Sequence, residues 1–245
     1  MVDNRPIGVF DSGVGGLTVL EEIKKINPNE KYIYLKDSEN FPYGEKSKEE
    51  IIKLTRNNIK KLLEQNVKMV VIACGTATSQ SLDIVKNEFD IPIIGIIEPT
   101  VNYVTKLNLE KIGVMATVGT IRSGMWEKSI KENLPKIQVI NQACPVLASM
   151  AEEEKIYSKE SLDAVHEYVK IFKENNVDTI ILGCTHYPMY DEIIRNEFDY
   201  DVNLINVGVA VADEVKLILK NDKNLLTWLN FMNIIHVYLK NKGAK

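Results

Sequence analysis

The chain has 245 residues, a length that suits one large domain or two modest ones. Hydrophobic residues make up 45% of it and charged residues 26%, the balance of an ordinary globular protein. The net charge is −4, with Lys and Arg spread along the sequence, so no basic stripe is available to bind nucleic acid. An anionic small molecule is compatible with this charge, because backbone N–H groups at helix N-termini bind carboxylates locally.

The N-terminal residues and the cysteines bear on where the chain works. The first residues lack the basic stretch and apolar run of a signal peptide. The nearest approach to a membrane span, residues 225–239, is too short and contains polar residues. The three cysteines are odd in number and far apart, which does not predict a disulfide framework. We therefore expect a cytoplasmic protein with free thiols and no membrane contact.

The spacing of apolar residues predicts strands that alternate with helices along the chain. Strands are expected at residues 7–10, 32–35, 69–73 and 93–97, and helices at 17–26 and 48–65. A glycine-rich turn with Gly13, Gly15 and Gly16 separates the first strand from the first helix. This alternation predicts βαβ units with parallel strands, and hence an α/β fold.

The sequence also repeats itself at an interval of about 110 residues, which should be considered before any single motif. Three pairs of segments match: 67–76 (VKMVVIACGT) with 177–186 (VDTIILGCTH), 86–90 (KNEFD) with 195–199 (RNEFD), and 6–10 (PIGVF) with 111–115 (KIGVM). We infer two similar α/β domains with mostly parallel sheets, related by a pseudo-two-fold axis. The active site is expected in the cleft between them.

The domain boundaries follow from the repeat. Residues 1–97 together with 207–245 are predicted to form the first domain, and residues 98–206 the second. The join is expected at residues 97–100, where Pro99 follows the apolar strand 93–97.

Each half contains a strand that ends at a cysteine, Cys74 or Cys184. Ligands of open α/β sheets bind outside the carboxyl ends of the strands, so facing halves would direct both thiols into one cleft. Two opposed acid/base groups suit racemisation: one removes a proton from a carbon, and the other returns a proton to the opposite face. A thiol fits this task because its pKa of about 8.5 falls near helix N-termini or a cationic His.

Each cysteine has nearby residues that could tune it. His186 lies two residues after Cys184, and Asp11 ends the first strand. Their repeat-mates are Thr76 and Ala116, so the pseudo-symmetry is broken by chemistry. Such a difference is expected when the substrate itself is chiral.

Simpler interpretations apply to the same residues. A single cysteine at a strand end is more often a small buried hydrophobe, and Cys144, which has no repeat-mate, is interpreted in that way. No CxxC or HxxxH spacing supports a metal site, so none is expected. FDSGVGG lacks the full dinucleotide spacing and a P-loop lysine. It is either a plain tight turn or a turn whose backbone approaches a small anion.

Five stretches of the chain together resemble the glutamate racemase family, within the wider aspartate/glutamate racemase group. They are IGVFDSGVGGLTVL, the Phe41-Pro42-Tyr43-Gly44 loop, VIACGTATS, PIIGIIEP and ILGCTHYP. They fall in order from residue 7 to residue 188, over about three quarters of the chain. The resemblance implies interconversion of L- and D-glutamate without pyridoxal phosphate or another cofactor and without metal. It also implies a role in supplying D-glutamate for peptidoglycan in a bacterial cytoplasm, and a homodimer.

The resemblance also implies roles for individual residues. Cys74 and Cys184 match the two catalytic bases, and Asp11, Glu152 and His186 match residues that assist them. By its local sequence alone, Glu152 belongs to a charge run, 152–154, of the kind that is usually solvated. The positions expected to bind glutamate are Asp11, Ser12, Pro42, Tyr43, Gly44, Gly75, Thr76, Thr185 and His186.

Three departures from the family pattern keep other functions open. Gly75 replaces the usual Asn, which removes a side-chain hydrogen bond of about 1–3 kcal/mol unless a water fills the space. Residues 206–208 replace a serine-glycine turn, and residues 221–245 do not resemble the family's final strand and helix. The alternatives are a racemase of another acidic amino acid such as aspartate, a catalytically weak binding or regulatory homologue, and a thiol redox protein.

Overall fold

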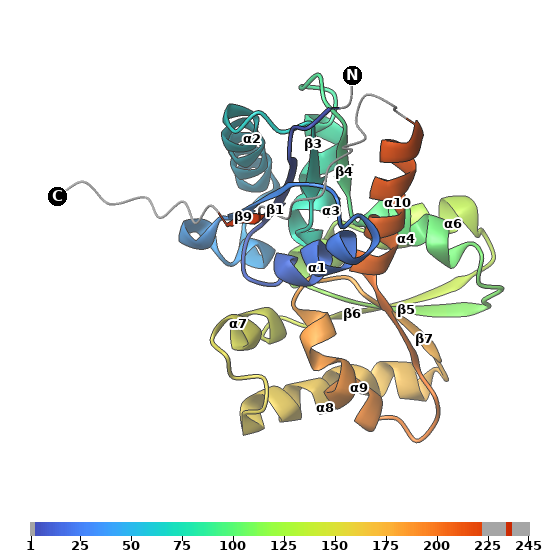
Figure 1. The fold of residues 1–245 in the computed structure, drawn as a ribbon. Helices are drawn as coiled ribbons and strands as arrows, with labels where there is room; N and C mark the ends of the chain where they lie inside the picture. The colour runs from blue at the N-terminus through green and yellow to red at the C-terminus, as the bar shows by residue number, and fades with distance from the viewer. Residues whose placement is uncertain (1–2, 222–233, 237–245) are drawn as a thin grey trace.

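The computed structural model describes residues 3–221 and 234–236, and its strands form two separate sheets, one above the other in Figure 1. The first sheet has the order β4-β3-β1-β2-β9, with β1 (Ile7–Asp11), β2 (Tyr32–Lys36), β3 (Met69–Ile72), β4 (Ile93–Gly95) and β9 (Ile234–His236). The second has the order β6-β5-β7-β8, with β5 (Lys111–Ala116), β6 (Gln138–Ala143), β7 (Thr179–Leu182) and β8 (Asn203–Asn206). Every strand pair is parallel.

The two sheets share one topology. The order β2-β1-β3-β4 in the first corresponds strand for strand to β6-β5-β7-β8 in the second. The sequence repeats fall on equivalent strands, with 6–10 on β1 and 111–115 on β5, and with 67–76 and 177–186 on β3 and β7. The predicted fold, two similar α/β halves with parallel sheets, is confirmed.

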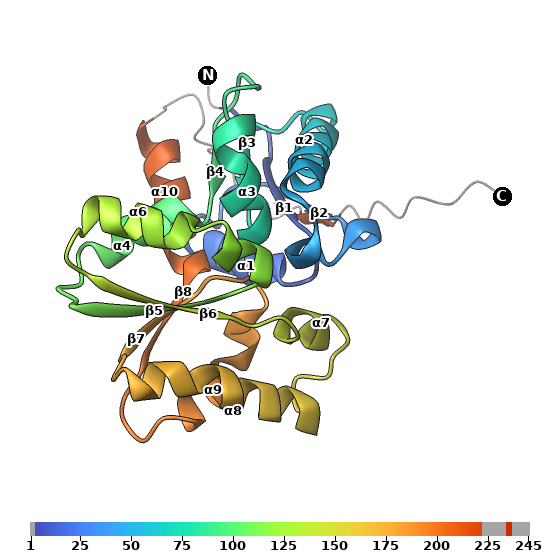
Figure 2. The ribbon, with the colours of Figure 1, turned by 180° about the vertical axis from the view of Figure 1, so that it is seen from behind.

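Helices cover both sheets (Figures 1 and 2). Those before β5 are α1 (Gly16–Ile26), α2 (Lys48–Glu64), α3 (Gly75–Val85) and α4 (Ile97–Val104). Those after it are α5 (Val118–Arg122), α6 (Met125–Asn133), α7 (Leu147–Glu152), α8 (Lys159–Glu174), α9 (Asp191–Asn196) and α10 (Val207–Asn221). The part of the chain that the structure describes also contains three short 3₁₀ turns: η1 (Ser38–Asn40), η2 (Tyr43–Glu45) and η3 (Tyr187–Tyr190).

The helices have local causes that are visible in the sequence. In α1 the apolar residues Val19, Leu20 and Ile23 recur at helical spacing and are buried. The helix α2 begins after Ser47, whose hydroxyl accepts a hydrogen bond from the backbone N–H of Glu50 at 3.2 Å. Caps and periodicity of this kind place the helix boundaries within a residue or two of those predicted.

One apolar core joins the two halves. It extends from Val9 and Val71 on the first sheet to Val114 and Ile181 on the second, and it includes Trp126. All five side chains are buried. Burial of apolar area at about 25 cal/mol per Å² makes this shared core a main source of the free energy that keeps the halves packed.

The chain after β8 packs against elements of the first half. The helix α10 contacts α1 and α4, and it lies beside them in Figure 1. The strand β9 extends the first sheet at its β2 edge, with Tyr32 opposite Ile234. The division at residues 97 and 206 stays a prediction. Residues 222–233 and 237–245, with most of the apolar run 225–239 and of the atypical tail, lie outside the described residues.

The strand predicted at residues 93–97 is shorter than expected. β4 ends at Gly95, and α4 begins at Ile97, so the predicted join around Pro99 is helical. Proline is tolerated in the first turn of a helix, where its missing N–H has no intrahelical partner to lose. The apolar run alone does not show where the strand ends, because a helix can bury the same apolar side chains as a strand does. Within residues 3–221 and 234–236, no helix is long and apolar enough to cross a bilayer.

Candidate active site

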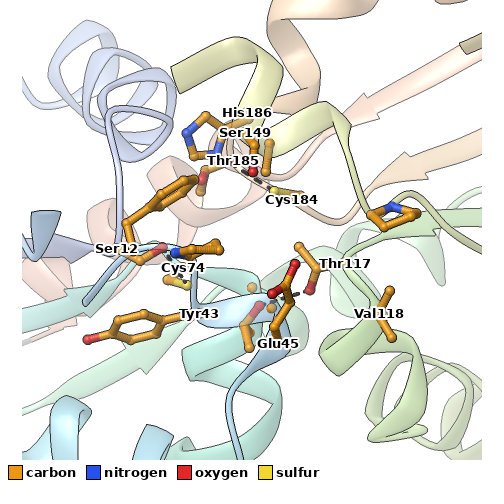
Figure 3. Close-up of a pocket in the computed structure, with 17 residues that line it drawn as sticks. Ser12, Tyr43, Glu45, Cys74, Thr117, Val118, Ser149, Cys184, Thr185 and His186 are labelled. Atoms are coloured by element: carbon orange, nitrogen blue, oxygen red, sulfur yellow. Dashed lines mark hydrogen bonds between the residues drawn. The ribbon is translucent and has the colours of Figure 1, made fainter. Parts of the chain in front are cut away.

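A cavity between the two halves brings together residues from the carboxyl ends of β1, β3, β5 and β7 (Figure 3). Its lining includes ten of the predicted site residues and positions: Ser12, Pro42, Tyr43, Gly44, Cys74, Gly75, Thr76, Cys184, Thr185 and His186. Two others, Asp11 and Glu152, do not line the cavity and contact the residues that do. Parallel strands end at the same edge of a sheet, so residues far apart in sequence meet there.

Cys74 is the N-cap of α3. The backbone N–H of Ala77 donates to its sulfur at 3.5 Å, and the hydroxyl of Ser12 lies 3.6 Å from the same atom. Burial raises the pKa of the Cys74 thiol to about 12, and the negative charge of Asp11 adds to the effect. The thiol of Cys74 is therefore protonated at neutral pH in the absence of a ligand.

Cys184 follows β7 and has a different neighbour. The Nδ1 atom of His186 lies 3.8 Å from the Cys184 sulfur, and the ring of Phe41 packs on the imidazole with centroids 5.8 Å apart. Figure 3 shows Cys74 beside Ser12 and Tyr43, and Cys184 beside Thr185 and His186. Neither cysteine is in a disulfide.

The second nitrogen of His186 contacts Glu152, at the end of α7. Nε2 lies 3.1 Å from Oε2 of Glu152, and the backbone N–H of Val14 donates to the same oxygen at 2.8 Å. Burial lowers the pKa of His186, but the contacts with Cys184 and Glu152 outweigh it and raise the pKa to about 10. The backbone N–H of Gly15 also lies 3.3 Å from Nε2, but a protonated ring donates there, so the shorter contact to Glu152 prevails.

Glu152 is held ionised by its partners. Burial alone would raise the pKa of this carboxyl, but hydrogen bonds from His186 and Lys36 and the N–H of Val14 lower it to about 2. The expectation that residues 152–154 form a solvated face is wrong for Glu152, whose side chain is 16% exposed. The charge run predicted solvation because a local pattern does not show which residues of the other half cover it.

Asp11 is fully buried at the end of β1. Its Oδ2 accepts the backbone N–H of Gly13 at 2.9 Å, and its Oδ1 accepts the hydroxyl of Thr185 at 3.3 Å. Burial raises the pKa of Asp11 to about 6, although His186 and these hydrogen bonds oppose the rise. A carboxyl with this pKa exchanges protons readily at neutral pH.

The glycine-rich turn after β1 passes directly against the second half. A Cβ atom added to Gly15 would lie 2.6 Å from both the Thr185 hydroxyl and Nδ1 of His186. At Gly13 it would lie 2.6 Å from a carboxylate oxygen of Glu152. The glycines of FDSGVGG therefore let the backbone approach side chains of the opposite half. The interpretation that this turn approaches a small anion stays a prediction.

The loop that carries Tyr43 and Gly44 is held by hydrogen bonds to the carboxylate of Asp37. The hydroxyl of Tyr43 donates to Oδ2 of Asp37 at 2.5 Å, and the amide of Asn58 donates to the same oxygen at 3.0 Å. Burial and Asp37 raise the pKa of Tyr43, so it stays a neutral donor. The amide of Asn40 binds the other oxygen of Asp37 at 2.9 Å. This network holds the loop at the cavity wall.

The family model for Asp/Glu/Hydantoin racemases matches residues 7–219. The chain belongs to this racemase family. A relative from Lactococcus lactis subsp. cremoris, a glutamate racemase, is 42% identical over 89% of this chain and 80% of its own length. Another glutamate racemase, from Bacillus cereus, is 39% identical over 91% of this chain and 83% of its own length.

Solved structures of glutamate racemases have the same fold. The Francisella tularensis enzyme, in complex with D-glutamate, has a TM-score of 0.87 and 38% identity, covering 94% of this chain and 87% of its own. The Escherichia coli enzyme, in complex with L-glutamate and an activator, has a TM-score of 0.77 and 30% identity over 88% and 83%. An aspartate racemase from Picrophilus torridus, 18% identical with a TM-score of 0.63, shares the fold alone. The predicted family is confirmed, and with it the expectation of a racemase.

The presence of glycine at position 75 of this racemase-family chain has a steric reason, which the sequence alone did not show. A Cβ atom at Gly75 would lie 2.3 Å from the backbone carbonyl oxygen of Gly183, which belongs to the other half. The space expected for a side chain or a water is thus closed by backbone. Glycine at position 75 lets the start of α3 approach the end of β7.

Other residues of the cavity were not predicted: Phe41, Glu45, Thr117, Val118, Pro145, Ala148 and Ser149. The hydroxyl of Thr117 is hydrogen-bonded to that of Thr76 at 2.9 Å, across the two halves. Thr117 follows β5 as Ser12 follows β1, so the repeat already pointed to it. Lys36, which forms an ion pair with Glu152, had no such signal because no motif includes it.

Proposed function

We propose that this chain interconverts L- and D-glutamate with Cys74 and Cys184 as its two acid/base groups. The carrying observation is that two free cysteines, each following an equivalent strand of a duplicated fold, line one cavity. Relatives that are glutamate racemases and cover most of the chain support glutamate as the substrate. Complexes of two structural neighbours with D- and L-glutamate support it further.

The proposed reaction is a balanced proton exchange at one carbon. One sulfur, as thiolate, takes the α-proton of glutamate and leaves a carbanion. The other sulfur, as thiol, gives a proton to the opposite face of that carbon. After one turnover the two sulfurs still hold one proton between them, but it has moved from the sulfur that gave a proton to the sulfur that took one. The roles are exchanged in the reverse direction.

The proposed assisting residues serve different cysteines. His186 lies near enough to the Cys184 sulfur to pass a proton to or from it, and Glu152 holds the imidazole. Asp11 is assigned to Cys74, because its charge acts on that thiol and its pKa of about 6 suits a proton acceptor. Positioned acid/base groups of this kind contribute about 10²–10⁴-fold to rates.

The proposed substrate contacts surround the two sulfurs. The hydroxyls of Ser12, Thr76 and Thr185 and the Tyr43-Gly44 loop would bind the amino and carboxylate groups. The N-terminus of α3, with backbone N–H groups at Gly75 and Thr76, favours an anion. The proposal extends to a homodimer that needs no cofactor and that supplies D-glutamate for peptidoglycan in a bacterial cytoplasm.

The test is incubation of the purified chain with L-glutamate in heavy water, without added cofactor. Loss of circular dichroism and exchange of the α-proton, followed by NMR, are expected together. Absence of both signals across pH 6–9 with reducing agent present would overturn the proposal.

The same assay separates the alternatives. Turnover of aspartate in preference to glutamate would favour a different acidic substrate. Glutamate binding by calorimetry without exchange would favour a binding or regulatory protein. A reversible Cys74–Cys184 disulfide with no response to glutamate would favour a redox protein.

A further inference from the structure

Lys36, the last residue of β2, connects the first half to the acid/base residues of the second. Its ammonium group forms an ion pair with Oε1 of Glu152, at the end of α7. The side chains are only 15% and 16% exposed, so this pair is screened less by solvent than a surface pair. Lys36 pairs in register with Asp11 of β1, which places it at the edge of the sheet where the cavity lies.

The two oxygens of Glu152 have different partners. Oε1 pairs with Lys36, whereas Oε2 accepts from Val14 and contacts His186. The contacts therefore run from Lys36 through Glu152 and His186 to the Cys184 sulfur. Lys36 does not line the cavity and would not touch the substrate.

The burial of Glu152 explains why its carboxylate needs cationic partners. Burial disfavours an ionised Glu152, and a charge left without a partner there would take up a proton. The groups that face Glu152 are Lys36 from β2, Val14 N–H after β1 and His186 after β7, with Asp11 and Cys184 beyond His186. On its own segment, Glu153 is exposed and pairs with Lys155.

We propose that Lys36 is a positioning residue for the proposed racemisation: it keeps Glu152 ionised and directed at His186, so that His186 can exchange a proton with Cys184. This inference rests on the proposed function. Lys36 belongs to one half, and Glu152, His186 and Cys184 belong to the other. The arrangement therefore depends on the contact between the two halves, because the ion pair of Lys36 with Glu152 crosses it.

The test compares Lys36→Met, which keeps the length but removes the charge, with Lys36→Arg, which keeps the charge. For Lys36→Met, kcat/KM is expected to fall about 10-fold or more, equally for both enantiomers because the equilibrium constant of racemisation is one. The acid limb of the pH profile becomes steeper below the Asp11 pKa of about 6, because Glu152 now takes up a proton more easily in the same range. The primary isotope effect grows for the enantiomer whose α-proton faces Cys184. Lys36→Arg restores most of the rate.

A matched control is Lys25→Met, which removes a surface ion pair with Glu22 on α1 and should leave the pH profile unchanged. A second readout does not need turnover: the ¹³C titration of the Glu152 carboxyl should move to higher pH in Lys36→Met and not in the control. If Lys36→Met does not fold, Lys36→Gln replaces it.

The outcomes separate the inference from the proposed function. A wild-type chain without exchange or inversion overturns the proposed function. The titration of the Glu152 carboxyl then tests by itself whether Lys36 keeps that group ionised. An active wild type with an unchanged pH profile and unchanged Glu152 titration in Lys36→Met overturns the inference alone. A uniform loss of rate with lower thermal stability and no shift in either titration also overturns it, since that result describes a purely structural ion pair.

Discussion

The two halves of the molecule share a fold, but the surroundings of their cysteines differ. Cys74 caps the eleven-residue helix α3 and has a serine hydroxyl as neighbour. Cys184 is followed by the short turn η3 and has an imidazole as neighbour. The thiol of Cys74 has a pKa raised to about 12, whereas His186 beside Cys184 is a cation that is linked to Glu152.

The difference teaches that duplication and divergence supplied separate parts of the site. The repeated strand order places a thiol at each of two equivalent positions. The residues around each thiol differ between the two repeats: His186 stands where the first half has Thr76, and Glu152 contacts it from the end of α7. A symmetric pair of thiols thus acquires unlike proton partners, as a chiral substrate requires.

The largest expected effect is the loss of either thiol. Cys74→Ser and Cys184→Ser should each lower racemisation by about 10²–10⁴-fold, because a hydroxyl is a far weaker acid than a thiol. Each variant should keep α-proton exchange without inversion for one enantiomer, and the two variants should differ in which enantiomer that is. NMR in heavy water measures this. Cys144→Ser, a buried cysteine outside the cavity lining, is the control, and exchange of the same enantiomer by both variants would contradict the opposed arrangement.

The next effect compares the two neighbours. His186→Asn should lower kcat/KM by about 10²-fold, since it removes a group that passes a proton. Ser12→Ala should lower it by less than about 10-fold, because it removes one hydrogen bond to sulfur. Primary isotope effects measured from each enantiomer should become unequal in His186→Asn. Equal effects in the two variants would mean that the halves are functionally alike.

A smaller effect concerns how closely the start of α3 approaches the end of β7. Gly75→Ala and Gly75→Asn should both raise the KM for glutamate, because a Cβ atom would meet the carbonyl oxygen of Gly183 at 2.3 Å. Overpacking of this kind costs about 1–3 kcal/mol, which corresponds to a change of about 5- to 150-fold in an equilibrium. Steady-state kinetics measure it. An unchanged KM in Gly75→Ala would show that the halves adjust at no cost.

The smallest effect contrasts two carboxyls in their influence on stability. The pKa of Asp11 is raised to about 6, so its stabilising effect is complete below about 4 and is lost as the pH rises through 6. The pKa of Glu152 is lowered to about 2, so its effect is present above about 4.5 and is lost as the pH falls towards 2. At pH 7.5, Asp11→Asn should therefore stabilise the fold by about 1–2 kcal/mol, and Glu152→Gln should destabilise it similarly. Urea unfolding at pH 4 and 7.5 measures both, and shifts of the same sign at pH 7.5 would contradict the assignment.

Much of the fold could be predicted because its signals are local. The apolar spacing of β1, α1 and α2 placed these elements closely, since periodicity reflects which face a segment buries. The repeat predicted two related sheets, and the glycine-rich turn and the two strand-end cysteines pointed to the cavity. These features are visible in the sequence itself, without knowledge of which segments pack together.

What the sequence alone determined is therefore the alternation of strands and helices, its duplication and the two thiols. Tertiary structure decided the rest. It buried Glu152 where a charge run predicted a solvated face, brought Lys36 to it from another sheet, and placed Gly183 against Gly75. It also set Thr117 against Thr76. The physical reason is that burial and ion pairing depend on which surfaces of the two halves meet, and no local pattern of residues encodes that contact.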